Sequence, residues 1–120
     1  MTDTEELKPS DVLDHAATLT DYWGWCRSHY IGSKGAMCHV GAIEAAAGAT
    51  THYQHPDGTW DLEWVDDESA RALVRAAAAY DVKAIGETWI VDWNDTTCKS
   101  KKEAVAKLRE AAELARSEGR

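Results

Sequence analysis

The stretch SKKEAVAKLREAAELA, residues 100–115, decides the fold class because it carries both a helix start signal and a continuous apolar face. Ser100, followed three residues later by Glu103, is the pattern of a capping box, which predicts that a helix begins here. Apolar residues then recur at the spacing of one helix face, namely Ala104, Val105, Leu108, Ala111, Ala112 and Ala115. The stretch therefore predicts a C-terminal helix that packs inward on a helical core.

Three further helices are predicted from the spacing of apolar residues. Ser10, which follows Pro9, is a helix start signal for the first of them. Residues 87–93 fit either a helix or a strand, and we favour a helix that places Trp89 and Trp93 in the core. The three predicted spans are residues 11–22, residues 37–47, and a segment from Asp66 or Asp67 to about Asp81.

The segment between residues 51 and 65 is the least regular part of the chain. His55-Pro56-Asp57-Gly58 is typical of a turn, and residues 59–65 alternate in polarity as a strand does. There is room here for one small β-hairpin. We therefore predict a mostly α fold, a single compact domain over residues 1–120 with about four helices and frayed ends at residues 1–9 and 117–120.

Composition and charge exclude several classes of protein. The net charge of −8 argues against nucleic-acid binding, which needs clustered Lys and Arg. No apolar run reaches the roughly 18 residues of a membrane-spanning helix. The acidic N-terminus does not resemble a signal peptide, so we expect a cytoplasmic protein. Its three cysteines are then expected to be free thiols, metal ligands or a nucleophile rather than a disulfide framework. Nothing in the composition indicates a cofactor.

Three short motifs, in a fixed order, resemble those of a known family. They are Trp25 ahead of a Gly-bearing loop, Cys38-x-x-Gly41-Ala42, and Trp93-Asn94-Asp95 ahead of the capped C-terminal helix. This order resembles a domain family of unknown function found in actinobacteria and their phages, over residues 23–112. The chain departs from the family pattern at Arg27-Ser28 and in its long acidic middle. The resemblance implies a small protein that binds a host protein, and it implies no activity.

The surplus of tryptophan favours a protein-binding surface. The chain has six tryptophans and no phenylalanine, and a small core does not hold so many large rings. Trp60 and Trp64 lie in the least regular segment, where side chains often face outward and carry function. Exposed tryptophans are typical of binding hot spots. The predicted binding residues are Trp60 and Trp64, followed by Trp23, Trp25 and Tyr30.

A small cysteine-dependent hydrolase is an alternative function. Such a site needs a thiol, a His base and an Asn or Asp that orients the base. At a helix start, Cys38 is expected to have a lowered pKa, because helix N-termini favour anions. The competing interpretation of Trp93-Asn94-Asp95 is a purely structural turn. The candidate catalytic residues are Cys26, Cys38, His29, His39, Asn94 and Asp95.

A zinc-stabilised domain is the second alternative. Cys26-x-x-His29 and His52-x-x-His55 have ligand-like spacing, although they lack the regular spacing of paired zinc knuckles. If no metal is bound, Cys38 is expected to be a buried core residue. The leading hypothesis is a non-enzymatic protein that acts by binding another protein.

Overall fold

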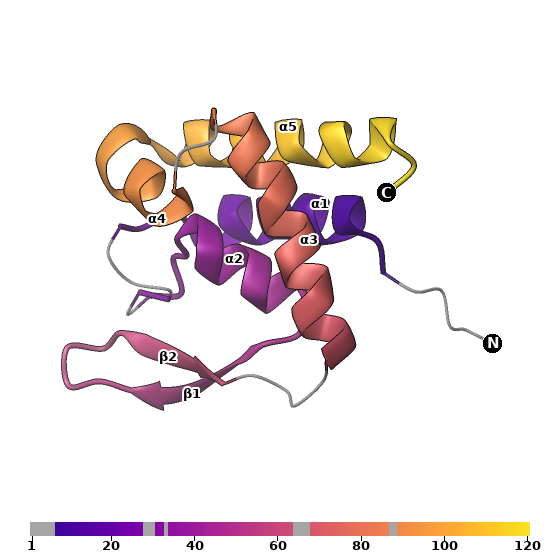
Figure 1. Ribbon diagram of the computed structural model, residues 1–120. Coiled ribbons are helices and arrows are strands. Elements are labelled where there is room, and N and C mark those ends of the chain that lie inside the picture. The colour runs from indigo at the N-terminus through magenta and orange to yellow at the C-terminus, as the bar shows by residue number, and fades with distance from the viewer. Residues whose placement is uncertain (1–6, 28–30, 33, 64–67, 87–88) are drawn as a thin grey trace.

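The computed structural model describes residues 7–27, 31–32, 34–63, 68–86 and 89–120. In that part of the chain the fold is mostly α, as predicted, with one two-stranded sheet (Figure 1). In chain order the elements are α1 (Pro9–Trp23), α2 (His39–Ala46), β1 (Thr50–Gln54), β2 (Trp60–Glu63), α3 (Glu68–Ala84), α4 (Ile90–Asp92), the π-helical turn η1 (Trp93–Thr97) and α5 (Lys101–Ser117).

The main core lies where α1 and α5 run antiparallel, with α3 crossing both (Figure 1). Its contact surfaces are mostly alanine, which lets the helix backbones approach closely. Leu13 of α1 and Leu108 of α5 are fully buried there, and burying a leucine side chain contributes about 1.5–3 kcal/mol. The other buried residues of this interface are Val12, Ala16, Ala17, Ala111, Ala112 and Ala115.

The predicted helix boundaries are partly confirmed. The hydroxyl of Ser100 accepts the Glu103 N–H at 3.2 Å and begins α5, as the capping pattern predicts. The prediction for Ser10 is wrong, because α1 begins at Pro9, and proline suits the first helical position. The Ser10 hydroxyl instead donates to the carbonyl of Arg120 at 2.9 Å, which ties the start of α1 to the C-terminus.

The third helix, predicted to end at about Asp81, ends three residues later. α3 continues to Ala84, and Asp81 is completely buried on its inner side. The helix is followed by Gly86, whose φ of +90° is a conformation that glycine adopts without strain. The predicted caps Asp66 and Asp67 lie outside the described residues.

The small central helix and the hairpin are both present. α2 packs against α1 and α3, and the sulfur of Cys38 caps it by accepting the Gly41 N–H at 3.3 Å. β1 and β2 pair antiparallel, from Thr50 opposite Glu63 to Gln54 opposite Trp60. The Trp60 N–H donates to the carbonyl of Ile31 at 3.0 Å, which connects the hairpin to the helical part.

None of the helices in the described ranges is both long and apolar enough to cross a membrane.

Candidate functional site

The three sequence motifs meet at the side chain of Asn94, which is 1% exposed. Its Oδ1 accepts hydrogen bonds from Trp25 Nε1 at 2.8 Å and from the backbone N–H of His39 at 3.0 Å. Its Nδ2 donates to the Cys26 carbonyl and to Asp95 Oδ1, each at 3.0 Å. One amide thus joins the loop after α1, the start of α2 and η1. We call Trp25, Cys26, Cys38, His39, Asn94 and Asp95 the motif cluster.

Short extended segments bring the first two motifs together. The Met37 N–H donates to the Gly24 carbonyl at 2.9 Å, and the Cys26 N–H donates to the Met37 carbonyl at 3.1 Å. These bonds make Trp25 and Met37 a parallel bridge pair. Gly24 ends α1 with a φ of +102°, a conformation that favours glycine. The Gly24 position therefore lets the chain turn from α1 into the bridge.

His39 is fully buried, and both of its ring nitrogens face oxygen atoms. Nδ1 lies 2.8 Å from Asp81 Oδ2, and Nε2 lies 3.0 Å from the Ala104 carbonyl. A carbonyl only accepts hydrogen bonds, so the contact to Ala104 requires a hydrogen on Nε2, and the other nitrogen is occupied by the Asp81 carboxyl group. The other oxygen of Asp81, Oδ1, has no hydrogen-bond partner in the part of the chain that the structure describes. Neither nitrogen of His39 is placed to accept a proton from a thiol.

The prediction that the pKa of Cys38 is lowered is wrong. Burial raises the pKa of the Cys38 thiol to about 11, and it outweighs the opposing effect of the Gly41 N–H. Burial also raises the pKa of Cys26. The candidate catalytic residues are close together, but their thiols are held in the protonated form and their histidine is engaged elsewhere. His29, the other candidate base, lies outside the described residues.

The candidate zinc ligands are only partly described. The Cys26 thiol donates to the Ala36 carbonyl at 3.3 Å, and His55 Nε2 lies 2.9 Å from Asp61 Oδ1 in the hairpin. His29 and the side chain of His52 lie outside the described part. Within the described part, no three His, Cys, Asp or Glu side chains are grouped so that they could hold a metal ion.

The predicted binding residues are placed differently from one another. Trp60 is half-buried and packs against the main core. Trp25 is also half-buried, with the guanidinium of Arg27 5.3 Å from its ring centre. Trp23 is half exposed, while Trp64 and Tyr30 lie outside the described residues. Of the predicted residues that are described, Trp23 is the most open to contact by another molecule.

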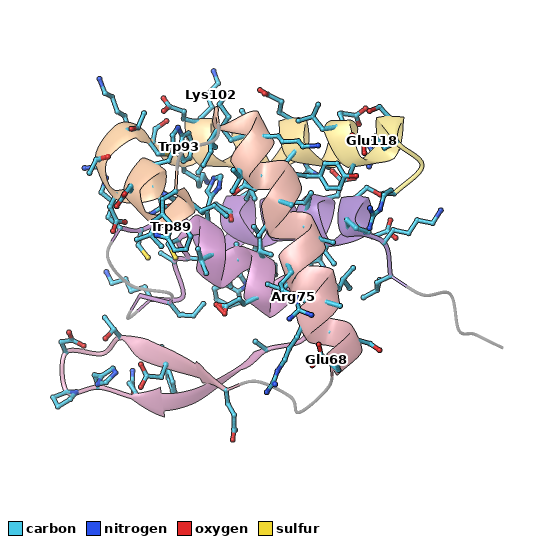
Figure 2. All side chains as sticks on the ribbon, in the orientation of Figure 1. Glu68, Arg75, Trp89, Trp93, Lys102 and Glu118 are labelled. Atoms are coloured by element: carbon cyan, nitrogen blue, oxygen red, sulfur yellow. The ribbon has the colours of Figure 1, made fainter. Side chains whose placement is uncertain are left out.

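Trp89 and Trp93 differ, although both were predicted to lie in the core. Trp93 is 5% exposed and packs with Ile85, Ile90 and Cys98, as predicted, whereas Trp89 is 70% exposed. The prediction for Trp89 is wrong because α4 begins only at Ile90, so the two rings do not share a helix face. Figure 2 marks both residues at the end of the molecule where α4 lies.

Exposed apolar side chains occur on two segments at this end of the molecule. Tyr22 is 78% exposed, Trp23 50%, Trp89 70% and Val91 36%. Tyr22 and Trp23 end α1, and Trp89 and Val91 lie at the start of α4. Trp25, two residues after Trp23, packs against the cluster that contains Ile90 and Trp93, which brings the two segments to the same end of the molecule. We call Tyr22, Trp23, Trp89 and Val91 the aromatic surface.

Residues 4–114 match the model of a family of unknown function (DUF6197). The chain belongs to this family. The predicted resemblance to a family of unknown function is confirmed, and the match spans all three motifs. No curated protein and no solved structure matches the chain.

Two residues of this region, Asp81 and Tyr22, were not singled out from the sequence, although the sequence pattern around each indicates its position. Asp81 falls at the same helical spacing as the buried residues Ala77, Tyr80 and Ala84, and a carboxylate on an apolar helix face signals a buried partner. Tyr22 falls outside the inward face of α1, which ends with the buried Thr20. A helical projection of residues 9–23 would have placed Tyr22 in solvent.

Proposed function

We propose that this protein acts by binding another protein through the aromatic surface. The observation that carries the proposal is the exposure of four large apolar side chains at one end of a small domain. Grouped exposed apolar side chains are typical of interaction sites, and Trp and Tyr are enriched among residues that dominate binding energy.

The α1 part of the surface is held in place before any partner arrives. The rings of Tyr22 and Trp23 lie 5.0 Å apart, edge to face. A Cβ atom placed on Gly35 would lie 2.8 Å from the ring of Trp23, so this ring packs directly on a glycine backbone. Rings that are already ordered lose little conformational entropy on binding, which favours affinity.

Charged residues of both signs lie next to the aromatic surface. Lys101 donates to the carbonyl of Asp21 at 3.0 Å, which places the start of α5 beside the end of α1, and its ammonium lies 3.7 Å from the Asp21 carboxylate. Asp92, next to Val91, is exposed as well. This arrangement favours a partner with an apolar centre and a polar rim that carries both charges. Given the resemblance to actinobacterial and phage proteins, we propose a partner in the cytoplasm of such a host.

Alanine variants test the proposal with a matched control. Trp23→Ala and Trp89→Ala each remove an exposed ring from the aromatic surface. Leu7→Ala is the control, because Leu7 is 57% exposed but precedes α1 at the opposite end. A partner captured by the wild-type protein is then purified, and its dissociation constant is measured with each variant.

We expect each tryptophan variant to weaken binding about 30-fold or more, as the loss of a hot spot of about 2 kcal/mol does. Leu7→Ala should bind as the wild-type protein does, and all three variants should keep the wild-type circular dichroism spectrum. Equal binding by all variants would contradict the assignment of the surface. Turnover of an amide or ester by the purified protein, abolished by Cys26→Ser or Cys38→Ser, would instead support the hydrolase alternative.

A further inference from the structure

Cys26 and Cys38 each directly follow one residue of an isolated parallel bridge. The bridge pair is Trp25 and Met37, defined by the two backbone hydrogen bonds around Met37. When two extended segments pair, residues that lie opposite each other across the pair are about 5 Å apart, and their side chains point to the same face. That separation is within the range of about 4.4–6.8 Å between Cα atoms that a disulfide requires.

The two thiols also share their surroundings. Both lie near the carboxylate of Asp95. Burial is the main cause that raises the pKa of Cys38, and the negative charge of a Cys26 thiolate raises it further. Two groups that affect each other in this way are close in space. The third cysteine differs, because Cys98 lies in the turn before α5 and its thiol donates to the Ser100 carbonyl at 3.4 Å.

We propose that Cys26 and Cys38 are a modification site, where they form a disulfide by exchange with a low-molecular-weight disulfide such as oxidised glutathione. Cys26, the more exposed of the two, loses its proton, and its sulfur attacks the external disulfide. A mixed disulfide forms, the external S–S bond breaks, and one external thiolate leaves and takes up a proton.

The buried thiol completes the exchange. Cys38 loses its proton, and its sulfur attacks the Sγ of Cys26, so that the Cys26–Cys38 bond forms and the mixed disulfide breaks. The second external thiolate leaves and is protonated. Overall, two protein thiols are oxidised to one disulfide, and the external disulfide is reduced to two thiols. Since the pKa of both thiols is raised, the exchange is slow at neutral pH.

The new bond would close residues 26–38 into a loop. This loop contains Gly35, on which the ring of Trp23 packs. Oxidation would therefore hold the backbone beneath part of the aromatic surface. The proposal does not depend on that surface binding a partner, because the disulfide is detected by its own chemistry.

Peptide mapping of the native protein tests the site directly. The folded protein is incubated with oxidised glutathione, and its remaining thiols are then trapped in denaturant at neutral pH with an excess of alkylating agent. It is digested with trypsin without reduction. Cleavage after Arg27, Lys34, Arg71, Lys83 and Lys99 places the three cysteines on separate peptides, residues 1–27, 35–71 and 84–99. We expect the first two peptides joined by a disulfide and the third alkylated at Cys98.

Single variants separate the two steps. Cys98→Ser should form the same disulfide, whereas Cys38→Ser, which keeps a side chain able to cap α2, should stop at glutathione bound to Cys26. In denaturant the pairing should lose its selectivity and include Cys98. The proposal is overturned if Cys26 of the folded protein forms a disulfide with Cys98 as readily as with Cys38. It is also overturned if Cys38 stays a thiol while Cys26 either remains alkylatable or stays bound to glutathione.

Discussion

The interface between α1 and α5 and the centre of the motif cluster, at Asn94 and His39, are both buried, but they are held together by different interactions. Ala16 and Ala17 of α1 face the small apolar side chains of α5, and none of these side chains carries a polar atom. In the motif cluster, Asn94 alone makes four hydrogen bonds to three separate parts of the chain. His39 adds a buried contact to Asp81.

This difference shows which changes each region should tolerate. Apolar packing has no preferred direction, so a core accepts a hydrophobic replacement of similar volume at a cost below about 1.5 kcal/mol. A hydrogen bond has a donor and an acceptor, so a replacement of equal volume fails if it exchanges their roles. Each buried polar group left without a partner costs about 1–3 kcal/mol.

The largest expected effect is in the apolar region. Leu108→Asp should unfold the domain, because a charge without a partner would enter the core at a cost of several kcal/mol, comparable with the whole stability of about 5–15 kcal/mol of a small domain. Ala106→Asp, at an exposed position of the same helix, is the control and should stay folded. Circular dichroism and urea titration distinguish them. A cooperatively folding Leu108→Asp protein would show that α5 packs differently.

Trp93 and Trp89 allow a comparison of a buried and an exposed ring beside the motif cluster. Trp93→Ala should lower the free energy of unfolding by about 3–5 kcal/mol, because a large buried ring is removed. Trp89→Ala should change it by less than about 0.5 kcal/mol, because Trp89 is 70% exposed. Denaturant titration of both variants is the measurement. Equal losses would mean that Trp89 is part of the core.

Glu44 is a second buried carboxylate, and it tests what burial does to the pH dependence of stability. Burial raises the pKa of Glu44 from 4.5 to about 7. Between these values the folded protein binds more protons than the unfolded chain, so this residue makes stability fall as the pH rises from about 4.5 to about 7.

Replacing Glu44 with Gln should remove this dependence. At pH 8, Glu44→Gln should be more stable than the wild-type protein by up to about 3 kcal/mol, and at pH 4 the two should agree. Urea titrations at both pH values measure the difference. A wild-type advantage at pH 8 would indicate that the carboxylate has a stabilising cationic partner.

The smallest expected effect is at the start of α5. Ser100→Ala should cost about 1 kcal/mol, because the hydroxyl that accepts the Glu103 N–H is lost. Thr97→Ala is the matched control and should be close to neutral, since Thr97 lies in η1, before the cap. If the midpoint of denaturation moves for Thr97→Ala and not for Ser100→Ala, the last helix begins earlier than described.

The sequence predicted the features whose causes are local. The cap and inward face of α5 follow from residues three or four positions apart, and the turn at His55-Pro56-Asp57-Gly58 correctly indicated a hairpin. The prediction for Trp89 failed at a helix boundary, because a shared helical spacing puts two residues on one face only if a single helix contains both.

Five of the six residues of the motif cluster were grouped from the sequence as candidate catalytic residues, but their hydrogen bonds could not be predicted, because they connect distant parts of the chain. Asn94 bonds to His39, 55 residues away, and His39 bonds to Asp81, 42 residues away. The local argument for a lowered pKa of Cys38 failed for the same reason, since the segments that bury its thiol are distant in the sequence. The order of the motifs indicated the family, whereas their meeting at one amide is visible only in the structure.

The central claim is that the stability of the motif cluster depends on the donor and acceptor roles of its hydrogen bonds, whereas that of the α1–α5 interface depends on side-chain volume. Equilibrium denaturation of Asn94→Asp and Leu13→Met tests this claim. Both changes nearly conserve volume. Asn94→Asp replaces two donated hydrogen bonds with a carboxylate that faces the Cys26 carbonyl and Asp95, so we expect a loss of about 3 kcal/mol or more. Leu13→Met should lose less than about 1.5 kcal/mol. Equal losses, or a greater loss for Leu13→Met, would contradict the account.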